Sequence, residues 1–166
     1  MIDLPLGHSI RHTRESDHAT ILEAIGRWCD TPGRDTLWRL VPRLFLQHFS
    51  STSWIVESEA GEIGAFLIGL RSQDHPEVAY IHLVGVDPEL RHAGLGRGLY
   101  QHFFEDMKKR GCTEAHAIAS PANKRSQAFH LAMGFTAGGE QGIDGVLAYP
   151  DYDGPGEWRV TFERAL

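Results

Sequence analysis

The chain has 166 residues, of which 42% are hydrophobic and 23% charged, and its formal net charge is −6. These values are typical of one soluble globular domain, and we expect residues 1–166 to form a single domain with one core. The negative charge disfavours nucleic acid or an anionic membrane as the main partner, and it suits a cationic amine substrate. No apolar run is long enough to span a bilayer and no signal peptide is recognisable, so we expect a cytoplasmic protein.

The cysteines and histidines form no pattern that is typical of a disulfide framework or a metal site. The chain contains two cysteines, Cys29 and Cys112, and ten scattered histidines without a His-Glu-x-x-His motif. We therefore expect reduced cysteines and no bound metal.

Taken in chain order, the sequence predicts a short strand, two helices, three strands, a long helix, a strand, a helix and two last strands. The expected ranges are 9–13, 16–28, 35–49, 54–58, 63–70, 78–86, 95–110, 114–119, 123–133, 135–137 and 158–163. Pro42 lies inside the second helix and should kink or restart it. Residues 138–156 are rich in Gly, Asp and Pro and should form a long loop. Because short turns join the early strands and helices join later ones, we expect a mixed α/β fold with a central mixed antiparallel and parallel sheet flanked by helices.

Several helix and strand faces follow from the spacing of side chains. The apolar residues expected on the second helix are Leu37, Leu40, Val41, Leu44, Phe45 and Phe49. In the strand 78–86, alternation places Tyr80, His82 and Val84 on one face, and Ile81 and Leu83 on the other. On the helix 123–133, a polar stripe consists of Asn123, Ser126 and His130, whereas Phe129, Ala132 and Met133 fall on the core side.

The stretch between the strand 78–86 and the long helix contains two glycines, Gly94 and Gly96. A glycine has no Cβ, so a ligand can approach the backbone N–H groups closely. The unpaired N–H groups at a helix start bind phosphate, helped by the helix dipole. The pattern matches neither G-x-x-x-x-G-K-[ST] nor G-x-G-x-x-G. An ordinary strand-to-helix turn that needs glycines for close packing is the other interpretation.

Two motifs resemble the GNAT N-acetyltransferase superfamily. Arg91-x-x-Gly94-x-Gly96 resembles its acyl-CoA pyrophosphate loop, [QR]-x-x-G-x-[GA]. The run from Asn123 to Phe135 resembles N-x-x-S-x-x-F-Y-x-x-x-G-F, with His130 in place of the tyrosine. The order of elements also resembles the GNAT fold over nearly the whole chain.

The resemblance implies a binding site for acetyl-CoA. The pyrophosphate would be held by the loop residues Arg91, His92, Ala93, Gly94, Leu95, Gly96 and Arg97. Asn123 and Ser126 would line the pantetheine and diphosphate arm. Val84, Gly85 and Val86 would hold the pantetheine amide by their backbone groups, where the strand splays from its neighbour. Each of these assignments has a purely structural alternative. Asn123 can be a helix N-cap, Ser126 a solvated helix residue, and Gly85 a small residue in a buried strand.

The resemblance also suggests two proton-handling histidines. His130 would replace the tyrosine that protonates the departing CoA thiolate, because a protonated imidazole can also donate. The alternative is that His130 only packs while another group or water supplies the proton. His82 is the first candidate for the base that accepts the amine proton, and the alternative is a half-buried histidine with a backbone partner.

We therefore expect an N-acetyltransferase in which a primary amine attacks acetyl-CoA directly in a ternary complex. The alternative is a non-catalytic acyl-CoA-binding sensor or regulatory domain of the same fold. The resemblance places the other wall of the acceptor pocket on the two N-terminal helices, with Trp38 and Phe45 as possible lining residues. The acidic and aromatic residues of the loop 138–156 could hold a cationic amine, although its composition is also ordinary turn chemistry. A homodimer is possible by resemblance alone.

Overall fold

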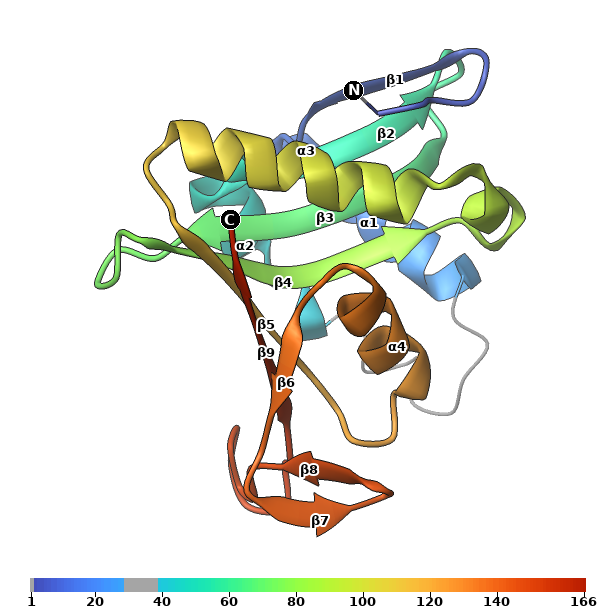
Figure 1. The fold of residues 1–166 in the computed structure, drawn as a ribbon. Helices are drawn as coiled ribbons and strands as arrows, with labels where there is room; N and C mark the ends of the chain where they lie inside the picture. Colours follow the sequence, from blue (N-terminus) through green and yellow to red (C-terminus); the bar gives the residue numbers. More distant parts are fainter. Residues whose placement is uncertain (1, 29–38) are drawn as a thin grey trace.

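The structure, a computed structural model, describes residues 2–28 and 39–166. Figure 1 shows a twisted sheet with helices on both of its faces. The strands are β1 (His8–His12), β2 (Trp54–Ser58), β3 (Ile63–Arg71), β4 (Val78–Val86), β5 (Glu114–Ala119), β6 (Thr136–Gly138), β7 (Gln141–Ile143), β8 (Val146–Ala148) and β9 (Val160–Ala165). The α-helices are α1 (His18–Trp28), α2 (Arg43–His48), α3 (Leu95–Lys109) and α4 (Lys124–Ala132), and short 3-10 helices span Glu15–Asp17, Ser50–Thr52 and Pro88–Ala93.

The main sheet is mixed, as the sequence predicts. Its strand order is β1-β2-β3-β4-β5-β9-β6, and β4 with β5 is the parallel pair among otherwise antiparallel neighbours. The short turn between β2 and β3 allows antiparallel pairing, whereas α3 makes the crossover that a parallel pair needs. The strands β2, β4 and β5 have the predicted bounds, and β1, β3, β6 and β9 differ by one or two residues.

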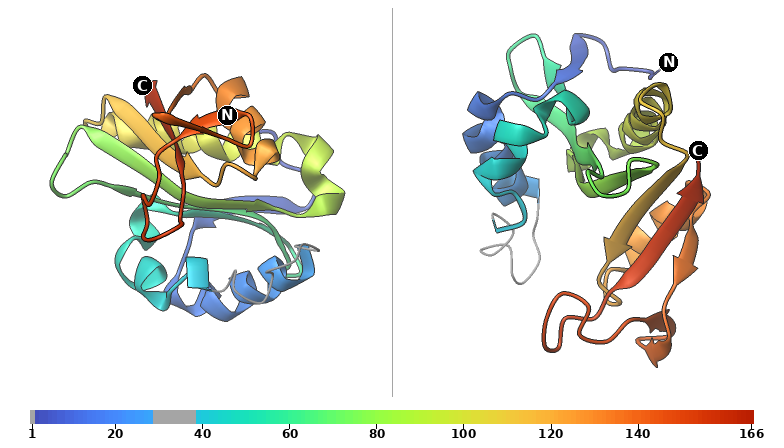
Figure 2. Two further views of the ribbon diagram at one scale, coloured as in Figure 1. Left: turned by 90° about the horizontal axis from the view of Figure 1, so that it is seen from below. Right: turned by 90° about the vertical axis from the view of Figure 1, so that its left-hand side faces the viewer.

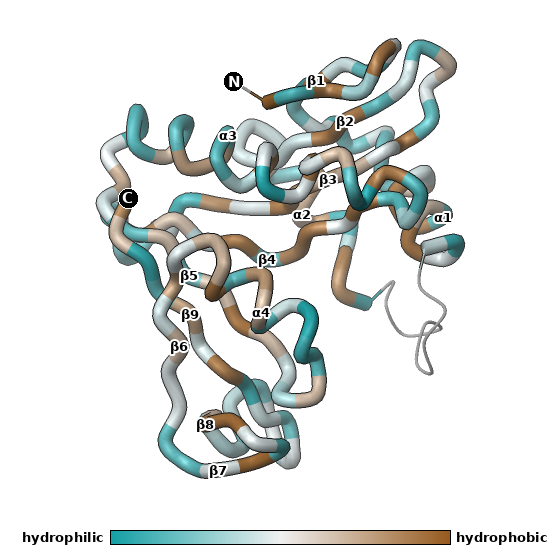
Figure 3. The backbone as a smooth tube through the Cα atoms, turned by 45° about the vertical axis from the view of Figure 1, so that its right-hand side comes forward, coloured by the Kyte–Doolittle hydropathy of each residue, from teal (hydrophilic) through white to brown (hydrophobic). Residues whose placement is uncertain are grey.

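One face of the sheet is covered by α3, whose apolar stripe forms the larger core. Leu95, Leu99, Phe103 and Met107 recur at helical spacing and are fully buried. They pack with Ala79 and other small or branched residues of the central strands. Figure 3 shows that hydrophobic stretches concentrate on these strands, while much of the outer side of α3 is hydrophilic.

The opposite face is covered by α1 and α2, which form a second core with residues of β2 and β3. The helix predicted over 35–49 begins at Arg43 in the described part of the chain, because Pro42 restarts the chain as its N-cap. Its predicted apolar face needs correction: Leu46 is buried, whereas 42% of Leu40 and 51% of Leu44 are exposed. Cys29, Leu37 and Trp38 lie outside the described residues.

The prediction of one long loop over 138–156 is wrong. Within it, β7 and β8 form a two-stranded hairpin. Asp144 and Gly145 make its two-residue turn, with φ of 50° and 76°, which is the Asp-Gly chemistry of a tight hairpin. The strands were missed because each has three residues, too few to establish an alternating pattern. No helix in the described residues is long and apolar enough to cross a membrane.

Candidate active site

The sheet opens between β4 and β5. These strands pair only at their starts, where Val78–Tyr80 lies beside Glu114–His116. Beyond Tyr80 they diverge, so the part of the sheet that contains β5, β9 and β6 turns away from the part that contains β1 to β4, as the right-hand view of Figure 2 shows. The splay that the family resemblance implies is therefore present, and Val84, Gly85 and Val86 lie on its β4 side.

Gly85 is required by the packing of the sheet itself. It pairs with Phe66 on β3, and a Cβ at Gly85 would lie 2.5 Å from the Phe66 ring. The close approach is thus made by an aromatic ring from the neighbouring strand. The irregularity in β4 occurs three residues earlier. Ile68 pairs with Leu83 while Gly69 pairs with Ile81, which leaves His82 as the extra residue of a β-bulge.

The bulge changes the faces predicted for β4. Ile81 and Val84 pack into the core under α3, whereas Leu83 packs into the core on the side of α1 and α2. His82 stacks on Phe45 of α2, so it lies on the α2 side of the sheet. The prediction that His82 and Val84 share a face is therefore wrong, because the extra residue shifts the alternation.

The half-buried ring of His82 has two close partners. Its Nε2 lies 2.5 Å from the backbone oxygen of Leu40, and its ring centroid is 4.1 Å from that of Phe45 at 13° between the planes. Burial lowers the pKa of His82, while the Leu40 carbonyl and the charge of Asp153 act in the opposite direction. The imidazole is therefore mainly neutral near pH 7 and can accept a proton.

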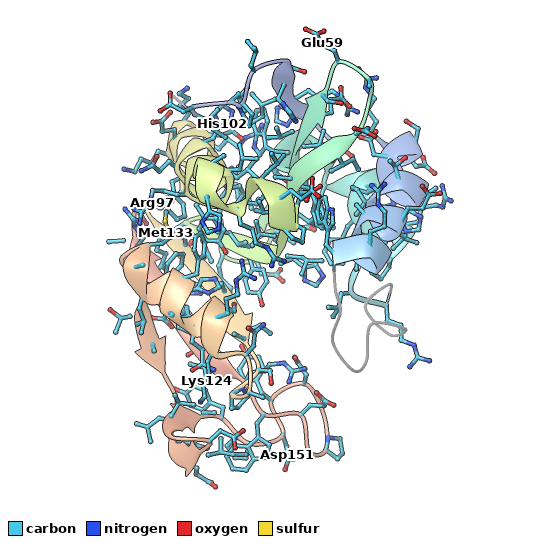
Figure 4. The ribbon with its side chains drawn as sticks, turned by 90° about the vertical axis from the view of Figure 1, so that its right-hand side faces the viewer. Glu59, Arg97, His102, Lys124, Met133 and Asp151 are labelled. Carbon is cyan, nitrogen blue, oxygen red and sulfur yellow. The ribbon has the colours of Figure 1, made fainter. Side chains whose placement is uncertain are left out.

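The loop between β4 and α3 is a 3-10 helix, Pro88–Ala93, not an irregular turn. The Asp87 carboxylate begins it by accepting a hydrogen bond from the Glu89 N–H at 2.9 Å. Gly94 ends it with a φ of 75°, a conformation that favours glycine. Arg91, His92, Ala93 and Gly94 are exposed, as is Arg97 on the first turn of α3, which Figure 4 labels.

The first turn of α3 offers backbone donors. Gly98 N–H donates to the Gly94 carbonyl at 2.9 Å, so the N–H groups of Leu95, Gly96 and Arg97 come before the first intrahelical bond. The Leu95 side chain is fully buried, which leaves only its backbone for a ligand. A Cβ at Gly96 would lie 3.5 Å from Phe129 of α4 and 3.6 Å from Val86 of β4. The three predicted cofactor-binding segments therefore meet at Gly96.

Asn123 and Ser126 begin α4 next to these segments. The Asn123 side chain accepts a hydrogen bond from the Ser126 N–H at 3.0 Å, so Asn123 is a helix N-cap. Ser126 is half-buried. Figure 4 shows Lys124 at the start of α4, near the β7–β8 hairpin, where its Nζ donates to the Asp144 carbonyl.

The predicted faces of α4 need correction. Ala132 was expected in the core but is exposed, whereas His130 and Gln127 are buried. His130 is only 4% exposed and stacks on Phe162 of β9, with 4.6 Å between the ring centroids. The polar stripe from Asn123 to His130 therefore runs from the surface into the core.

Both nitrogens of His130 have protein partners. Nδ1 lies 2.8 Å from the Ser126 carbonyl oxygen, which can only accept, so Nδ1 carries the proton in the neutral ring. Nε2 then accepts from the Tyr100 hydroxyl, 3.1 Å away. Burial lowers the pKa of His130 and raises that of Tyr100 well above its usual value. The sequence does not single out Tyr100, because spacing cannot reveal a partner 30 residues away.

Asp153 is one of the acidic residues of the loop 138–156, and the sequence does not distinguish it from the others. It forms an ion pair with Arg159, with 2.7 Å between Oδ2 and Nε, and its charge also acts on Tyr80, whose pKa rises to about 12 mainly through burial. The charge of Asp153 acts on both Tyr80 and His82, so the part of the loop that contains Asp153 lies near these two residues of β4. The only signal in the sequence is the acidic and aromatic composition of this loop.

Two other kinds of chemistry would need a metal site or a reactive cysteine. In the described residues, no three His, Cys, Asp or Glu side chains come together in a way that could hold a metal ion. Cys112 is buried, and burial raises the pKa of its thiol, which makes it a poor nucleophile.

Comparisons with known proteins agree with this geometry. The sequence model of the acetyltransferase (GNAT) family matches residues 15–135. A search of curated protein sequences finds no match.

Several solved structures share the fold at low identity. Ard1 from Thermoplasma volcanium is 16% identical, with a TM-score of 0.70 over 97% of this chain and 99% of that chain. The ribosomal-protein-S18-alanine N-acetyltransferase from Escherichia coli is 21% identical, with a TM-score of 0.63 over 95% and 93%. Diaminobutyrate acetyltransferase from Paenibacillus lautus is 19% identical, with a TM-score of 0.66 over 94% and 93%, in a complex with L-2,4-diaminobutyric acid and coenzyme A.

Proposed function

The chain belongs to the acetyltransferase (GNAT) family, and from this premise we propose that it transfers an acetyl group from acetyl-CoA to a primary amine. The observation that supports this most is the meeting of three segments at Gly96, beside the splay between β4 and β5. There the end of β4, the donor-rich start of α3 and the first turns of α4 surround one position without a side chain. The acceptor is unidentified.

We propose that acetyl-CoA binds along these segments. The N–H groups from Arg91 to Arg97 would hold the diphosphate, since a helix start presents unpaired donors and partial positive charge. The side chain of Ser126 would contact the pantetheine arm, and Asn123 would hold the first turn of α4 in place as its cap. The backbone of Val84, Gly85 and Val86 would bond the pantetheine amide at the open edge of β4.

In the proposed reaction the amine nitrogen attacks the acetyl carbonyl carbon. The new C–N bond forms, the C–S bond breaks, and CoA leaves as a thiolate that takes up a proton. Because only a neutral amine attacks, its proton must first leave, and we propose that His82 accepts it. The lowered pKa of His82 keeps the imidazole neutral, as this role requires.

The role of His130 as the acid stays a prediction, and its surroundings favour the alternative that it packs. A donor must be protonated, but burial lowers the pKa of His130. Both ring nitrogens are also engaged, with Ser126 and Tyr100. We propose that His130 joins α4 to α3 and that another group or water protonates the thiolate.

We propose direct transfer without an acyl-enzyme on Cys112, because Cys112 is buried with a raised pKa and its Sγ faces the Pro76 carbonyl oxygen at 3.7 Å. Incubation with acetyl-CoA alone should then leave the protein mass unchanged. An increase in protein mass of about 42 Da, which is what an acetyl group on Cys112 would add, would contradict this.

The alternative, a non-catalytic acyl-CoA sensor, shares the same binding segments. A panel of amines with acetyl-CoA separates the two functions. The transferase releases CoA thiol in proportion to an amine in the panel. A sensor binds CoA in calorimetry and releases none.

A further inference from the structure

The bulge turns His82 towards a hydrogen-bond partner that defines its tautomer. His82 is the extra residue between the Ile68–Leu83 and Gly69–Ile81 pairs, and its side chain points to the α2 side of the sheet. Its Nε2 lies 2.5 Å from the Leu40 carbonyl oxygen. A carbonyl oxygen only accepts hydrogen bonds, so Nε2 must carry the proton. In the neutral ring the lone pair is then on Nδ1.

The ring plane is fixed as well as the tautomer. Phe45 stacks on His82 at 4.1 Å and 13°, and Phe45 itself packs against the second core. A hydrogen bond at one nitrogen and a stacked face together determine where the other nitrogen points. The charged group whose field acts on this ring is Asp153, which favours a proton on it, and Tyr80 lies on the same face of β4.

We infer that His82 accepts the amine proton at Nδ1, and that the Leu40 carbonyl and Phe45 are the groups that position it. This inference rests on the proposed function, in which His82 is the base. When Nδ1 takes the proton, the Nε2–H bond to Leu40 persists and becomes a bond from a cation, which is stronger. The segment before α2 and α2 itself thus orient the base from the side of the sheet opposite α3.

The tautomer can be measured without any turnover. We would label the full-length protein with 15N-histidine and record long-range 1H–15N correlations near pH 8, using His82→Gln to assign the signal. We expect a protonated Nε2 and an unprotonated Nδ1 at His82. A protonated Nδ1 would overturn the inference while leaving acetyl transfer intact.

Kinetics then test the roles of these groups. His82→Gln keeps an N–H donor for the Leu40 carbonyl but has no base, so we expect kcat to fall by about 10²- to 10⁴-fold with CoA affinity and Tm unchanged. Phe45→Leu keeps an apolar side chain without the stack. We expect it to lower kcat/KM for the amine roughly tenfold by misorienting the base, with a mixed tautomer signal.

Leu44→Ala is the matched control, because Leu44 lies on the same helix and is 51% exposed. It should leave kinetics and tautomer unchanged. Equal effects of Phe45→Leu and Leu44→Ala would overturn the positioning role of Phe45. If His82→Gln is fully active, neither nitrogen of His82 is the base. If no amine is acetylated, the proposed function fails, whereas the tautomer is still read by NMR.

Discussion

At the scale of single residues, the buried pair of His130 and Tyr100 is the clearest departure from what the sequence suggests. Phenylalanine at His130 would leave the Tyr100 hydroxyl buried without its acceptor. A buried polar group without a partner costs about 1–3 kcal/mol. We therefore predict that His130→Phe lowers Tm in thermal unfolding and keeps most of the turnover.

The double variant His130→Phe with Tyr100→Phe is the control, because removing both polar partners is nearly neutral. It should recover much of the lost Tm. If His130→Phe instead abolishes turnover while Tm and CoA affinity stay unchanged, then His130 is the acid after all.

The pH dependence of the reaction also depends on one residue. Burial lowers the pKa of His82 from its ordinary 6.5. As the proposed base, His82 would be neutral and active above its lowered pKa, and its activity would be lost as the pH falls through that pKa. With an acceptor amine that does not titrate in this range, kcat/KM should rise to a plateau with an apparent pKa below 6.5. A midpoint above that value, or the same limb in His82→Gln, would contradict the assignment.

At the scale of elements, the start of α3 offers a test that separates folding from binding. Gly96 lies within the helix, and a Cβ there would make only ordinary contacts at 3.5 Å and beyond. Alanine in place of a helical glycine stabilises by roughly 0.5–1 kcal/mol. We predict that Gly96→Ala unfolds at a higher temperature and yet binds CoA more weakly, because the added methyl group would lie at the proposed diphosphate site.

Alanine at Gly94 should have the opposite effect on Tm. Its φ is 75°, and a Cβ there meets no atom within 4 Å. The left-handed conformation costs a non-glycine residue about 1–2 kcal/mol, so Gly94→Ala should lower Tm.

For Gly96→Ala, an unchanged CoA affinity measured by calorimetry would argue against the proposed diphosphate site.

How much the sequence could predict differs between elements for physical reasons. The strands β2, β4 and β5 were predictable because each has five or more residues with clear apolar content and strong turn signals at its ends. The bulge at His82 and the three-residue strands β7 and β8 were not. A bulge is defined by pairing with β3, and a hairpin of three-residue strands gains its stability from tertiary contacts such as the buried Ala148.

The candidate site follows the same division. The loop Arg91 to Arg97 and the motif at Asn123 were recognisable because they are local patterns. The Leu40 partner of His82 is 42 residues away, and the Tyr100 partner of His130 is 30 residues away. Local sequence carries no signal for such contacts, so the tautomer of His82 and the buried pair of His130 and Tyr100 had to come from the fold.

At the scale of the whole molecule, we expect the divided sheet to make stability depend on bound CoA. Beyond Tyr80 the two parts of the sheet no longer pair, and the proposed site contains segments from β4, α3 and α4. A ligand that binds only the folded state at 100 times its Kd stabilises by about 2.7 kcal/mol. For a chain of this size, each kcal/mol raises Tm by roughly 2–4 °C, so saturating CoA should raise Tm by several degrees. Gly96→Ala should reduce this increase.

The central proposal for this protein is that it transfers an acetyl group from acetyl-CoA to an amine. The most direct test is to follow the release of free CoA thiol from acetyl-CoA while primary amines of different charge and size are added one at a time. We predict that thiol release accelerates with at least one amine, in amounts equal to the acetylated amine formed. Tight CoA binding without amine-dependent thiol release across the panel would contradict the claim and leave the sensor function.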